Sequence, residues 1–238
     1  MSFDESWNKN VYSLGKSINK YPYGELVSIF FNSLKFLPEN KLQNKKDIKV
    51  LEIGCGAGNN LWFVDENGFD TYGIDGSEIV CEYAKKNLLD RNSNAQVKQA
   101  YFNDLPFDDN SIDIIFDREA TCCGTLDDIK ESWNEANRVL KKGGVVISFL
   151  FSDDSPYCIK ANNNECINTK LENNTFTDYE EGAFAGLGKV HFTSYEEISE
   201  IFHFCNIKFI NKHNNETIYD TSNNDFNYKE WIIVGVKK

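Results

Sequence analysis

The sequence predicts an α/β protein in which helices cover both faces of a mostly parallel sheet. From residue 48 onward, short apolar runs alternate with stretches whose apolar residues have helical spacing, and this alternation is typical of βαβ units. The chain has 238 residues, 41% of them hydrophobic and 26% charged. It is therefore long enough for a full core and too apolar to be disordered as a whole. No internal repeat or linker interrupts the pattern, so we expect one domain with insertions, over residues 1–238.

The first 47 residues form a leader before the alternating pattern begins. Pro22 disfavours helix at Tyr21, yet it is compatible with the start of a new helix. The helix predicted after it has an apolar stripe and ends at Pro38. We expect this helix to pack on the sheet and the aromatic-rich stretch before it to form a lid. The alternative is that aromatic residues such as Trp7 and Tyr23 only pack the helix onto the sheet.

Five apolar runs predict strands of the central sheet, with three helices between them. The helices are expected to begin near Gly58, Ser77 and Thr125. Thr125 precedes Asp128 by three residues, which is the spacing of a capping box, and a Gly-Gly pair at 143–144 is expected to end that helix. The strand runs are 48–53, 71–74, 96–101, 112–116 and 145–151, so the core of the domain spans residues 48–151.

The segment from 152 to 192 differs from the core because it is rich in Asn, Asp, Glu and Thr and has little periodicity. Its length exceeds that of ordinary connections, so we expect either a functional cap or a mobile excursion. Regular structure resumes at Ser194, where Glu197 completes a second capping box. A helix and two strands, at 207–210 and 231–236, then complete the segment 193–238.

The composition excludes several classes of protein. No run of about 18 apolar residues is present, so a membrane span is not expected, and the acidic N-terminus does not resemble a signal peptide. A formal net charge of −12 opposes a nucleic-acid partner. The seven cysteines never occur as Cys-x-x-Cys, which argues against a zinc site or a disulfide scaffold. We expect a cytoplasmic protein with reduced cysteines and no metal site.

The most informative segment joins the first apolar strand to a helix through Gly54, Gly56 and Gly58. Such glycines permit positive φ and let a ligand lie against bare backbone beside a helix N-terminus. A dinucleotide fingerprint has the spacing Gly-x-Gly-x-x-Gly, whereas the spacing here is Gly-x-Gly-x-Gly and Glu52 precedes it. That carboxylate favours a ligand with a cationic group over a pyrophosphate. Asp75, which ends the next strand, is placed to accept hydrogen bonds from both ribose hydroxyls of a nucleotide-type ligand.

Four motifs in this order resemble the class I S-adenosylmethionine-dependent methyltransferases. They are residues 50–58, 73–77, 105–113 and 138–144. The resemblance covers residues 48 to 151. It implies a Rossmann-like, doubly wound sheet of seven strands in the order 3-2-1-4-5-7-6, with the last strand antiparallel. It also implies S-adenosylmethionine as cofactor and S-adenosylhomocysteine as product.

The same resemblance implies roles for individual residues. The Gly54 loop, supported by Glu52, would pass the methionine part of the cofactor, while Asp75 would hold the ribose. The adenine would adjoin Phe102, and Asp117 would lie by the transferable methyl. Tyr101 stands where many members carry an acid, so Asn103 or Asp104 would recognise the adenine amino group. The cofactor-binding residues expected on this basis are Glu52, Gly54, Cys55, Gly56, Asn59, Asp75, Gly76, Phe102, Asn103, Asp104 and Asp117.

Residues for the acceptor are expected on loops that follow the strands. Arg118 and Glu119 come after strand four, and Lys189 and His191 come at the end of the long insertion. We expect His191, Arg118 and Glu119 to be catalytic. His191 is a candidate general base for a hydroxyl acceptor, with a strand residue of no chemical role as the alternative. A phosphate, phosphoramidate or carboxylate oxygen would need only cationic groups.

The leader carries a second resemblance, to the N-terminal lid of bacterial small-molecule methyltransferases. Trp7, Gly15-Lys16 and residues 19–23 carry it. Such enzymes are associated with surface polysaccharides, so we expect methyl transfer to a small polar, anionic acceptor, an oxygen of a sugar, phosphate or phosphoramidate in surface-glycan biosynthesis. Two alternatives stay open. One is an NAD(P)-dependent oxidoreductase, which the glycine spacing disfavours, and the other is a non-catalytic protein that binds S-adenosylmethionine.

Overall fold

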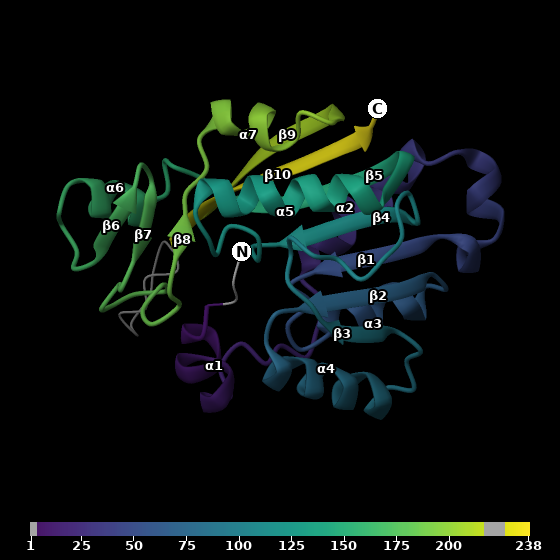
Figure 1. Cartoon of the computed structure of the whole chain (residues 1–238), viewed down its shortest axis with the longest axis horizontal. Coiled ribbons are helices and arrows are strands. Elements are labelled where there is room, and N and C mark those ends of the chain that lie inside the picture. The colour runs from purple at the N-terminus through teal and green to yellow at the C-terminus, as the bar shows by residue number, and fades with distance from the viewer. Residues whose placement is uncertain (1–3, 217–226) are drawn as a thin grey trace.

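The computed structural model describes residues 4–216 and 227–238, and a seven-stranded sheet forms its centre (Figure 1). The strand order is β3-β2-β1-β4-β5-β10-β9, and β10 is antiparallel to both of its neighbours. Because β9 and β10 are the sixth and seventh strands of this sheet along the chain, the predicted order 3-2-1-4-5-7-6 is confirmed. The strands are β1 (Lys49–Ile53), β2 (Asp70–Asp75), β3 (Gln96–Gln99), β4 (Ile112–Arg118), β5 (Leu140–Phe151), β9 (Cys205–Asn215) and β10 (Tyr228–Lys237).

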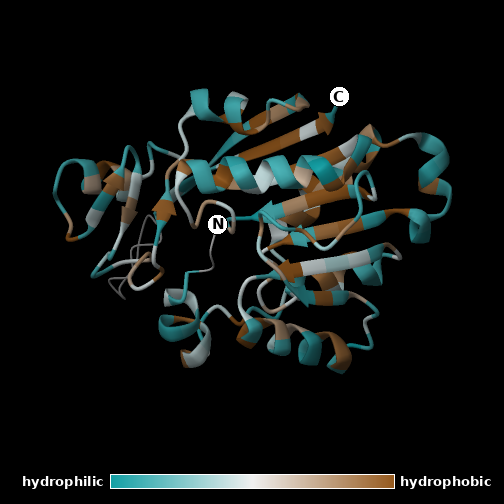
Figure 2. Ribbon diagram, in the orientation of Figure 1, coloured by the Kyte–Doolittle hydropathy of each residue, from teal (hydrophilic) through white to brown (hydrophobic). Residues whose placement is uncertain are grey.

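Helices cover both faces of the sheet. One face packs against α2 and α3, with α4 beside α3, and the other packs against α5 and α7, which lie in front of the sheet in Figure 1. Figure 2 shows apolar strands in the middle and a polar outer surface on α5. The helices are α1 (Ser6–Asn10), α2 (Gly24–Ser33), α3 (Asn59–Glu66), α4 (Glu78–Asp90), α5 (Leu126–Val139), α6 (Pro156–Asn162) and α7 (Tyr195–Ile201). Short 3-10 turns cover Tyr12–Leu14, Leu34–Phe36, Glu39–Gln43 and Lys45–Asp47.

Large aromatic side chains anchor the helices to the sheet. On α2, the Phe30 ring makes edge-to-face contacts with Phe63, Phe69 and Phe116, at centroid distances of 5.3 to 6.1 Å. On the opposite face, Trp133 of α5 is fully buried. Burying a large apolar side chain contributes roughly 1.5–3 kcal/mol, so these rings fix where the helices lie on the sheet.

The helix starts agree with the sequence, but one predicted helix end is wrong. Both capping boxes form, at Thr125 with Asp128 and at Ser194 with Glu197. The Gly-Gly pair at 143–144 does not end α5, because β5 already begins at Leu140. The last carbonyls of the helix accept hydrogen bonds from backbone N–H groups of residues 110 and 111, so a glycine cap is not needed.

The segment 152–192, called the cap segment below, is folded. It contains α6 and a small antiparallel sheet of β6 (Thr169–Glu172), β7 (Thr175–Thr177) and β8 (Val190–His191). Its own apolar cluster includes Tyr157, Phe176, Phe184 and Phe192. In Figure 1 the cap segment lies beyond the ends of β1 and β4 that carry the arrowheads, on the same side as α1. Within the described residues, no helix has both the length and the apolar character needed to span a membrane.

Candidate active site

A cavity of about 570 Å³ opens where the parallel strands end. This is the edge of an open α/β sheet at which ligands bind, and the volume is within the range of small-molecule sites. The cap segment, Tyr228 and residues 4–24 (the N-terminal segment below) supply the walls beyond the sheet edge. Of the predicted site residues, those that line the cavity are Glu52, Gly54, Cys55, Gly56, Asn59, Asp75, Gly76, Phe102, Arg118 and Glu119.

The glycine loop after β1 presents bare backbone to this cavity. Gly54 has φ 70°, and a Cβ there would collide with the side chain of Ala120. Gly56 has φ 50°, and a Cβ there would meet no atom within 4 Å. Only glycine adopts such backbone readily. Gly54 therefore permits the close approach of two loops, and Gly56 leaves open backbone against which a ligand can lie.

Asp75 ends β2 and faces this loop. Its Oδ2 accepts a hydrogen bond from the Gly56 N–H at 3.1 Å, and its Oδ1 accepts one from the Ser77 N–H at 3.0 Å. Burial raises the pKa of Asp75 to about 6, although these backbone donors act in the opposite direction. Each carboxylate oxygen keeps a lone pair, so Asp75 can accept hydroxyl donors from a ligand.

Glu52 is a buried carboxyl group on β1 with one oxygen unsatisfied. Its Oε1 accepts a hydrogen bond from Asn60 Nδ2 at 2.7 Å, whereas no donor of the described residues reaches its Oε2. Burial raises the pKa of Glu52 well above its usual range. A buried oxygen without a donor is costly, so this position suits a ligand that brings a donor or a positive charge.

The N-terminal segment closes over the cofactor end of the cavity. Asn59 Nδ2 donates to the Tyr21 carbonyl at 2.9 Å, and the Tyr23 N–H donates to Asn60 Oδ1 at 3.1 Å. Tyr12 is buried, and its pKa is raised by burial and by Asp75. The hydrogen bonds tie the segment to the start of α3, so it covers the glycine loop.

The acceptor end of the cavity is formed by the loop that follows β4. Arg118 Nη1 lies 2.6 Å from Glu119 Oε2, and the guanidinium stacks on the Tyr23 ring at 4.2 Å. Burial is the largest single effect and lowers the pKa of Arg118, but the acidic groups around it, Glu119 first among them, together raise the pKa by more, so the net shift is upward. Glu119 has φ 56°, a conformation that costs a non-glycine residue about 1–3 kcal/mol and is common at functional sites.

Asp117 supports this loop and does not line the cavity. Its Oδ1 accepts hydrogen bonds from the N–H groups of Ala120 and Thr121, and its Oδ2 accepts them from the hydroxyls of Thr121 and Ser148. Burial raises the pKa of Asp117 to about 6. Asp117 therefore holds the backbone of the loop that presents Arg118 and Glu119, and its place beside the methyl group stays a prediction.

Two residues expected beside the adenine also lie outside the cavity wall. The Asn103 amide contacts Glu131 Oε2 at 3.3 Å, and Asp104 pairs with Tyr101 through the backbone. The cavity is instead lined by Tyr101 and Phe102. Aromatic rings at this position can stack on a base.

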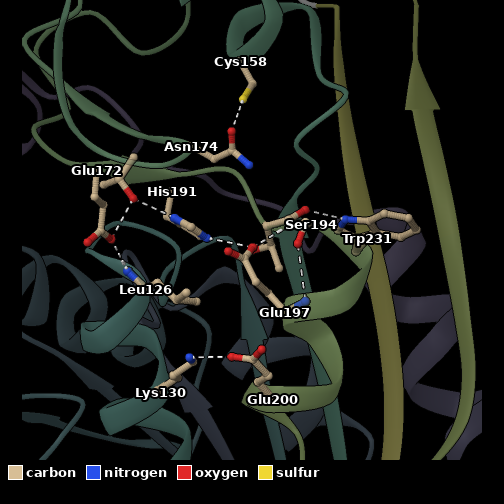
Figure 3. A network of polar contacts seen from close by, with 12 residues as sticks. Leu126, Lys130, Cys158, Glu172, Asn174, His191, Ser194, Glu197, Glu200 and Trp231 are labelled. Atoms are coloured by element: carbon tan, nitrogen blue, oxygen red, sulfur yellow. Dashed lines mark hydrogen bonds and ion pairs between the residues drawn. The ribbon is translucent and has the colours of Figure 1, made fainter. Parts of the chain in front are cut away.

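His191 lies in a buried network that joins the cap segment to the core (Figure 3). Its Nδ1 lies 2.7 Å from Thr175 Oγ1 and its Nε2 lies 3.3 Å from Glu197 Oε2. Thr175 Oγ1 also donates to Glu172 Oε1, which accepts from the Leu126 N–H of α5. His191 is fully buried and does not line the cavity. The geometry therefore places the predicted general base in a structural position.

Some cavity residues were not expected from the sequence. Tyr228 of β10 and the cap residues Phe184 and Leu187 line the acceptor end, together with Phe151 at the end of β5. Glu230, next to the apolar run of β10, contacts the same cluster through Tyr23. The sequence does hold a signal for Glu230, because it is a charged residue at the start of an apolar strand. Lys189 does line the cavity, with its Nζ 3.8 Å from Asp128 Oδ2.

The fold and this cavity define a nucleotide-type cofactor site of the methyltransferase class. Residues 51–148 match the family model described as "Methyltransferase domain". Over these residues the chain therefore matches a methyltransferase domain, and S-adenosylmethionine is the cofactor of the class that its motifs resemble. Three features of the cavity fit a ligand with an ammonium group and a ribose: the unpartnered Glu52 oxygen, the open backbone at Gly56 and the Asp75 carboxylate.

Known proteins of several kinds are similar to the chain. Over 131 residues it is 31% identical to 24-methylenesterol C-methyltransferase 2 of Oryza sativa subsp. japonica, covering 50% of this chain and 35% of that protein. The chain thus spans about a third of that relative's length. The PH0226 protein of Pyrococcus horikoshii OT3 has 20% identity and a TM-score of 0.67, with 100% of both chains covered. An S-adenosylmethionine-dependent methyltransferase from Clostridium acetobutylicum has 16% identity and a TM-score of 0.58, with 88% and 92% covered. At these identities the two structures show the shared fold.

Proposed function

We propose that this protein transfers the methyl group of S-adenosylmethionine to a small acceptor held between Glu119 and the cap segment. One observation carries the proposal: the same cavity is lined by the glycine loop and Asp75 at one end and by Glu119 at the other. The cofactor brings a methyl group bound to a positively charged sulfur. The protein's own part is to align the acceptor, exclude water and receive a proton.

The walls of the acceptor end favour an acceptor with an apolar body and one group that carries a proton. Aromatic side chains dominate this end, among them Tyr23, Phe151 and Phe184. The positive charge of Arg118 is already paired with Glu119. An anionic acceptor would have to displace that ion pair, so this geometry disfavours the phosphate and phosphoramidate acceptors expected from the sequence. We propose a hydroxyl oxygen, including one on a sugar, as the methylated atom.

A carbon acceptor is the second candidate. The aromatic walls suit an apolar substrate, and a sequence relative is named as a sterol C-methyltransferase. Methylation of a carbon centre that later loses a proton would also use the Glu119 carboxylate as a base. The two candidates differ in the product, which carries either an ether or a new carbon–carbon bond.

The test begins with the cofactor and then seeks the acceptor. Calorimetry should show binding of S-adenosylhomocysteine and none of NADH, and the reverse result would establish the oxidoreductase alternative. The protein is next incubated with isotopically methyl-labelled S-adenosylmethionine and a panel of sugars, aliphatic alcohols, amines and isoprenoid alkenes. Mass spectrometry should find a product heavier by one labelled methyl group. Glu119→Gln should lose that product and Glu196→Gln, an exposed position on α7, should keep it. Cofactor binding without turnover on any panel member would favour the non-catalytic alternative.

A further inference from the structure

Tyr23, directly before α2, is held at three points. Its backbone N–H donates to Asn60 Oδ1 at 3.1 Å, and its hydroxyl donates to Glu230 Oε1 at 3.1 Å. Its ring meets the ring of Phe149 edge to face, at a centroid distance of 6.0 Å. The three partners belong to α3, β10 and β5. Contacts with three different elements fix both the backbone and the ring of Tyr23.

The face of this fixed ring carries the guanidinium group of Arg118. The guanidinium carbon lies 4.2 Å from the ring centroid, and Nη1 lies 2.6 Å from Glu119 Oε2. An arginine side chain loses much conformational entropy when it is ordered, and its planar group is suited to stacking on a ring and to pairing with a carboxylate. Arg118 Nε is a buried donor that finds no partner among the described residues. The guanidinium therefore takes its orientation from the Tyr23 ring and from Glu119.

We propose that Tyr23 is a positioning residue, which holds Arg118 and through it the Glu119 carboxylate in the orientation that receives the acceptor's proton. The inference rests on the proposed methyl transfer. In that reaction a bond forms between the acceptor atom and the methyl carbon, and the C–S bond breaks with its electron pair left on sulfur. The acceptor's proton goes to the Glu119 carboxylate.

The position of the Glu119 carboxylate should control the rate. A base must lie within hydrogen-bond reach of the proton that it removes, and a misplacement of about 1 Å can lower a rate about 10²-fold. The side chain of Glu119 is 10% exposed, so its protein neighbours and not water surround it. A fixed arginine beside this carboxylate therefore contributes to turnover more than to acceptor affinity.

Tyr23 also reaches the cofactor end, but through its backbone. Asn60, which accepts from the Tyr23 N–H, donates through its Nδ2 to Glu52 Oε1 at 2.7 Å. A substitution at Tyr23 keeps the N–H group, so the link to Asn60 is preserved. Changes of the Tyr23 side chain should therefore disturb Arg118 and leave cofactor affinity nearly unchanged.

NMR spectroscopy of the full chain, without cofactor or acceptor, tests whether Tyr23 holds Arg118. The chain has three arginines, so the Nε–Hε signal of Arg118 is identified by its absence from Arg118→Lys. In the wild type and in Tyr23→Phe this signal should lie upfield, because a proton over the face of an aromatic ring is shielded. In Tyr23→Leu it should move downfield, while the signal of Arg138, which pairs with Glu135 and Asp109, stays in place. An Arg118 signal that is the same in Tyr23→Leu and wild type would overturn the inference.

Kinetics test the effect on the rate, with labelled S-adenosylmethionine and the panel member that the wild type methylates. Tyr23→Leu and Arg118→Lys should each lower kcat about tenfold or more, with little change in acceptor KM or in S-adenosylhomocysteine affinity. Tyr23→Phe keeps the ring and should retain most of the rate. The double variant Tyr23→Leu/Arg118→Lys should lose no more than the stronger single variant, because both changes disturb the same stack. Tyr83→Leu, at an exposed position on α4, is the matched control and should have the wild-type rate.

These measurements separate the positioning role from the methyl transfer on which it rests. Losses that multiply in the double variant, or losses confined to KM, contradict the positioning role even where methyl transfer is found. Should Tyr23→Leu not fold, Arg118→Lys disturbs the stack from the other side, and a wild-type kcat in that variant contradicts the role. If the Arg118 signal moves as expected but S-adenosylhomocysteine does not bind, the methyl-transfer proposal fails, whereas the hold of Tyr23 on Arg118 is supported.

Discussion

Replacing Asp75 with asparagine should stabilise the protein and weaken its cofactor binding at the same time. Burial raises the pKa of Asp75 from an ordinary value of 3.8 to about 6. Each unit of this pKa shift corresponds to about 1.4 kcal/mol. At neutral pH the ionisation of Asp75 therefore lowers the free energy of unfolding by about 3 kcal/mol. Asparagine has one acceptor oxygen for the two N–H donors of Gly56 and Ser77, and losing one bond costs about 1 kcal/mol. The net gain for Asp75→Asn at pH 7 is about 2 kcal/mol.

The pH dependence gives the sign of this effect. The folded pKa of Asp75 lies above the unfolded one, so its contribution to stability is present below pH 3.8 and is lost as the pH rises to about 6. Other buried carboxyl groups act in the same direction, so the informative quantity is the difference between variant and wild type. In urea unfolding, that difference should grow between pH 4 and 6 and then level off.

The same substitution should reduce affinity for S-adenosylhomocysteine. Charged hydrogen bonds to hydroxyls contribute about 1.5–3 kcal/mol, so calorimetry should find binding weaker by about 10- to 150-fold. Asp70→Asn, at the opposite end of β2, is the matched control and should change neither quantity. Parallel stability profiles for Asp75→Asn and wild type would refute the buried-charge argument, and unchanged affinity would refute the ribose assignment.

Three further substitutions separate the roles of the site residues. Glu119→Gln should lower kcat by about 10²–10⁴ with unchanged S-adenosylhomocysteine affinity, and a loss confined to KM would argue against a base. His191→Ala should lower the free energy of unfolding by about 1–3 kcal/mol because the buried Thr175 and the partly buried Glu197 lose their contacts, and proteolysis of the cap segment should become faster. Methyl transfer by the folded His191 variant should persist, and its loss at unchanged stability would restore His191 as the base. Gly54→Ala should abolish cofactor binding, since its φ of 70° and the contact with Ala120 exclude a Cβ, and normal affinity in that variant would contradict the loop assignment.

The central sheet and cofactor end were predictable because their signals are local in the sequence. The strand order followed from four ordered motifs, and both capping boxes followed from residues three positions apart. Asp75 ends β2 and Gly54 directly follows β1, so the parallel topology alone brings them to one edge of the sheet. Which of these side chains face the cavity and which are buried in the protein was not predictable in the same way. Asp117 also lies near the end of its strand, β4, yet its side chain accepts hydrogen bonds from the loop that follows the strand.

The acceptor end was hard to predict because segments far apart in the sequence form it. Glu119 follows β4, Glu230 belongs to β10, and Tyr23 precedes α2. No spacing rule relates three such positions. The small sheet of the cap segment has strands of two to four residues, and β6 is exposed along its length, which gives little periodicity to detect. His191 was selected for its residue type alone, which carries no information about burial.

The charge balance of the acceptor end argues for the chemistry proposed here. The charges of Arg118 and the Glu119 carboxylate cancel, and aromatic rings lie around this ion pair. A phosphate would add a negative charge beside a carboxylate, at a distance where low dielectric makes repulsion strong. A hydroxyl adds no charge when it binds beside the ion pair, and it loses its proton to the Glu119 carboxylate only during the reaction. The arrangement therefore favours a neutral acceptor whose proton is removed during the reaction.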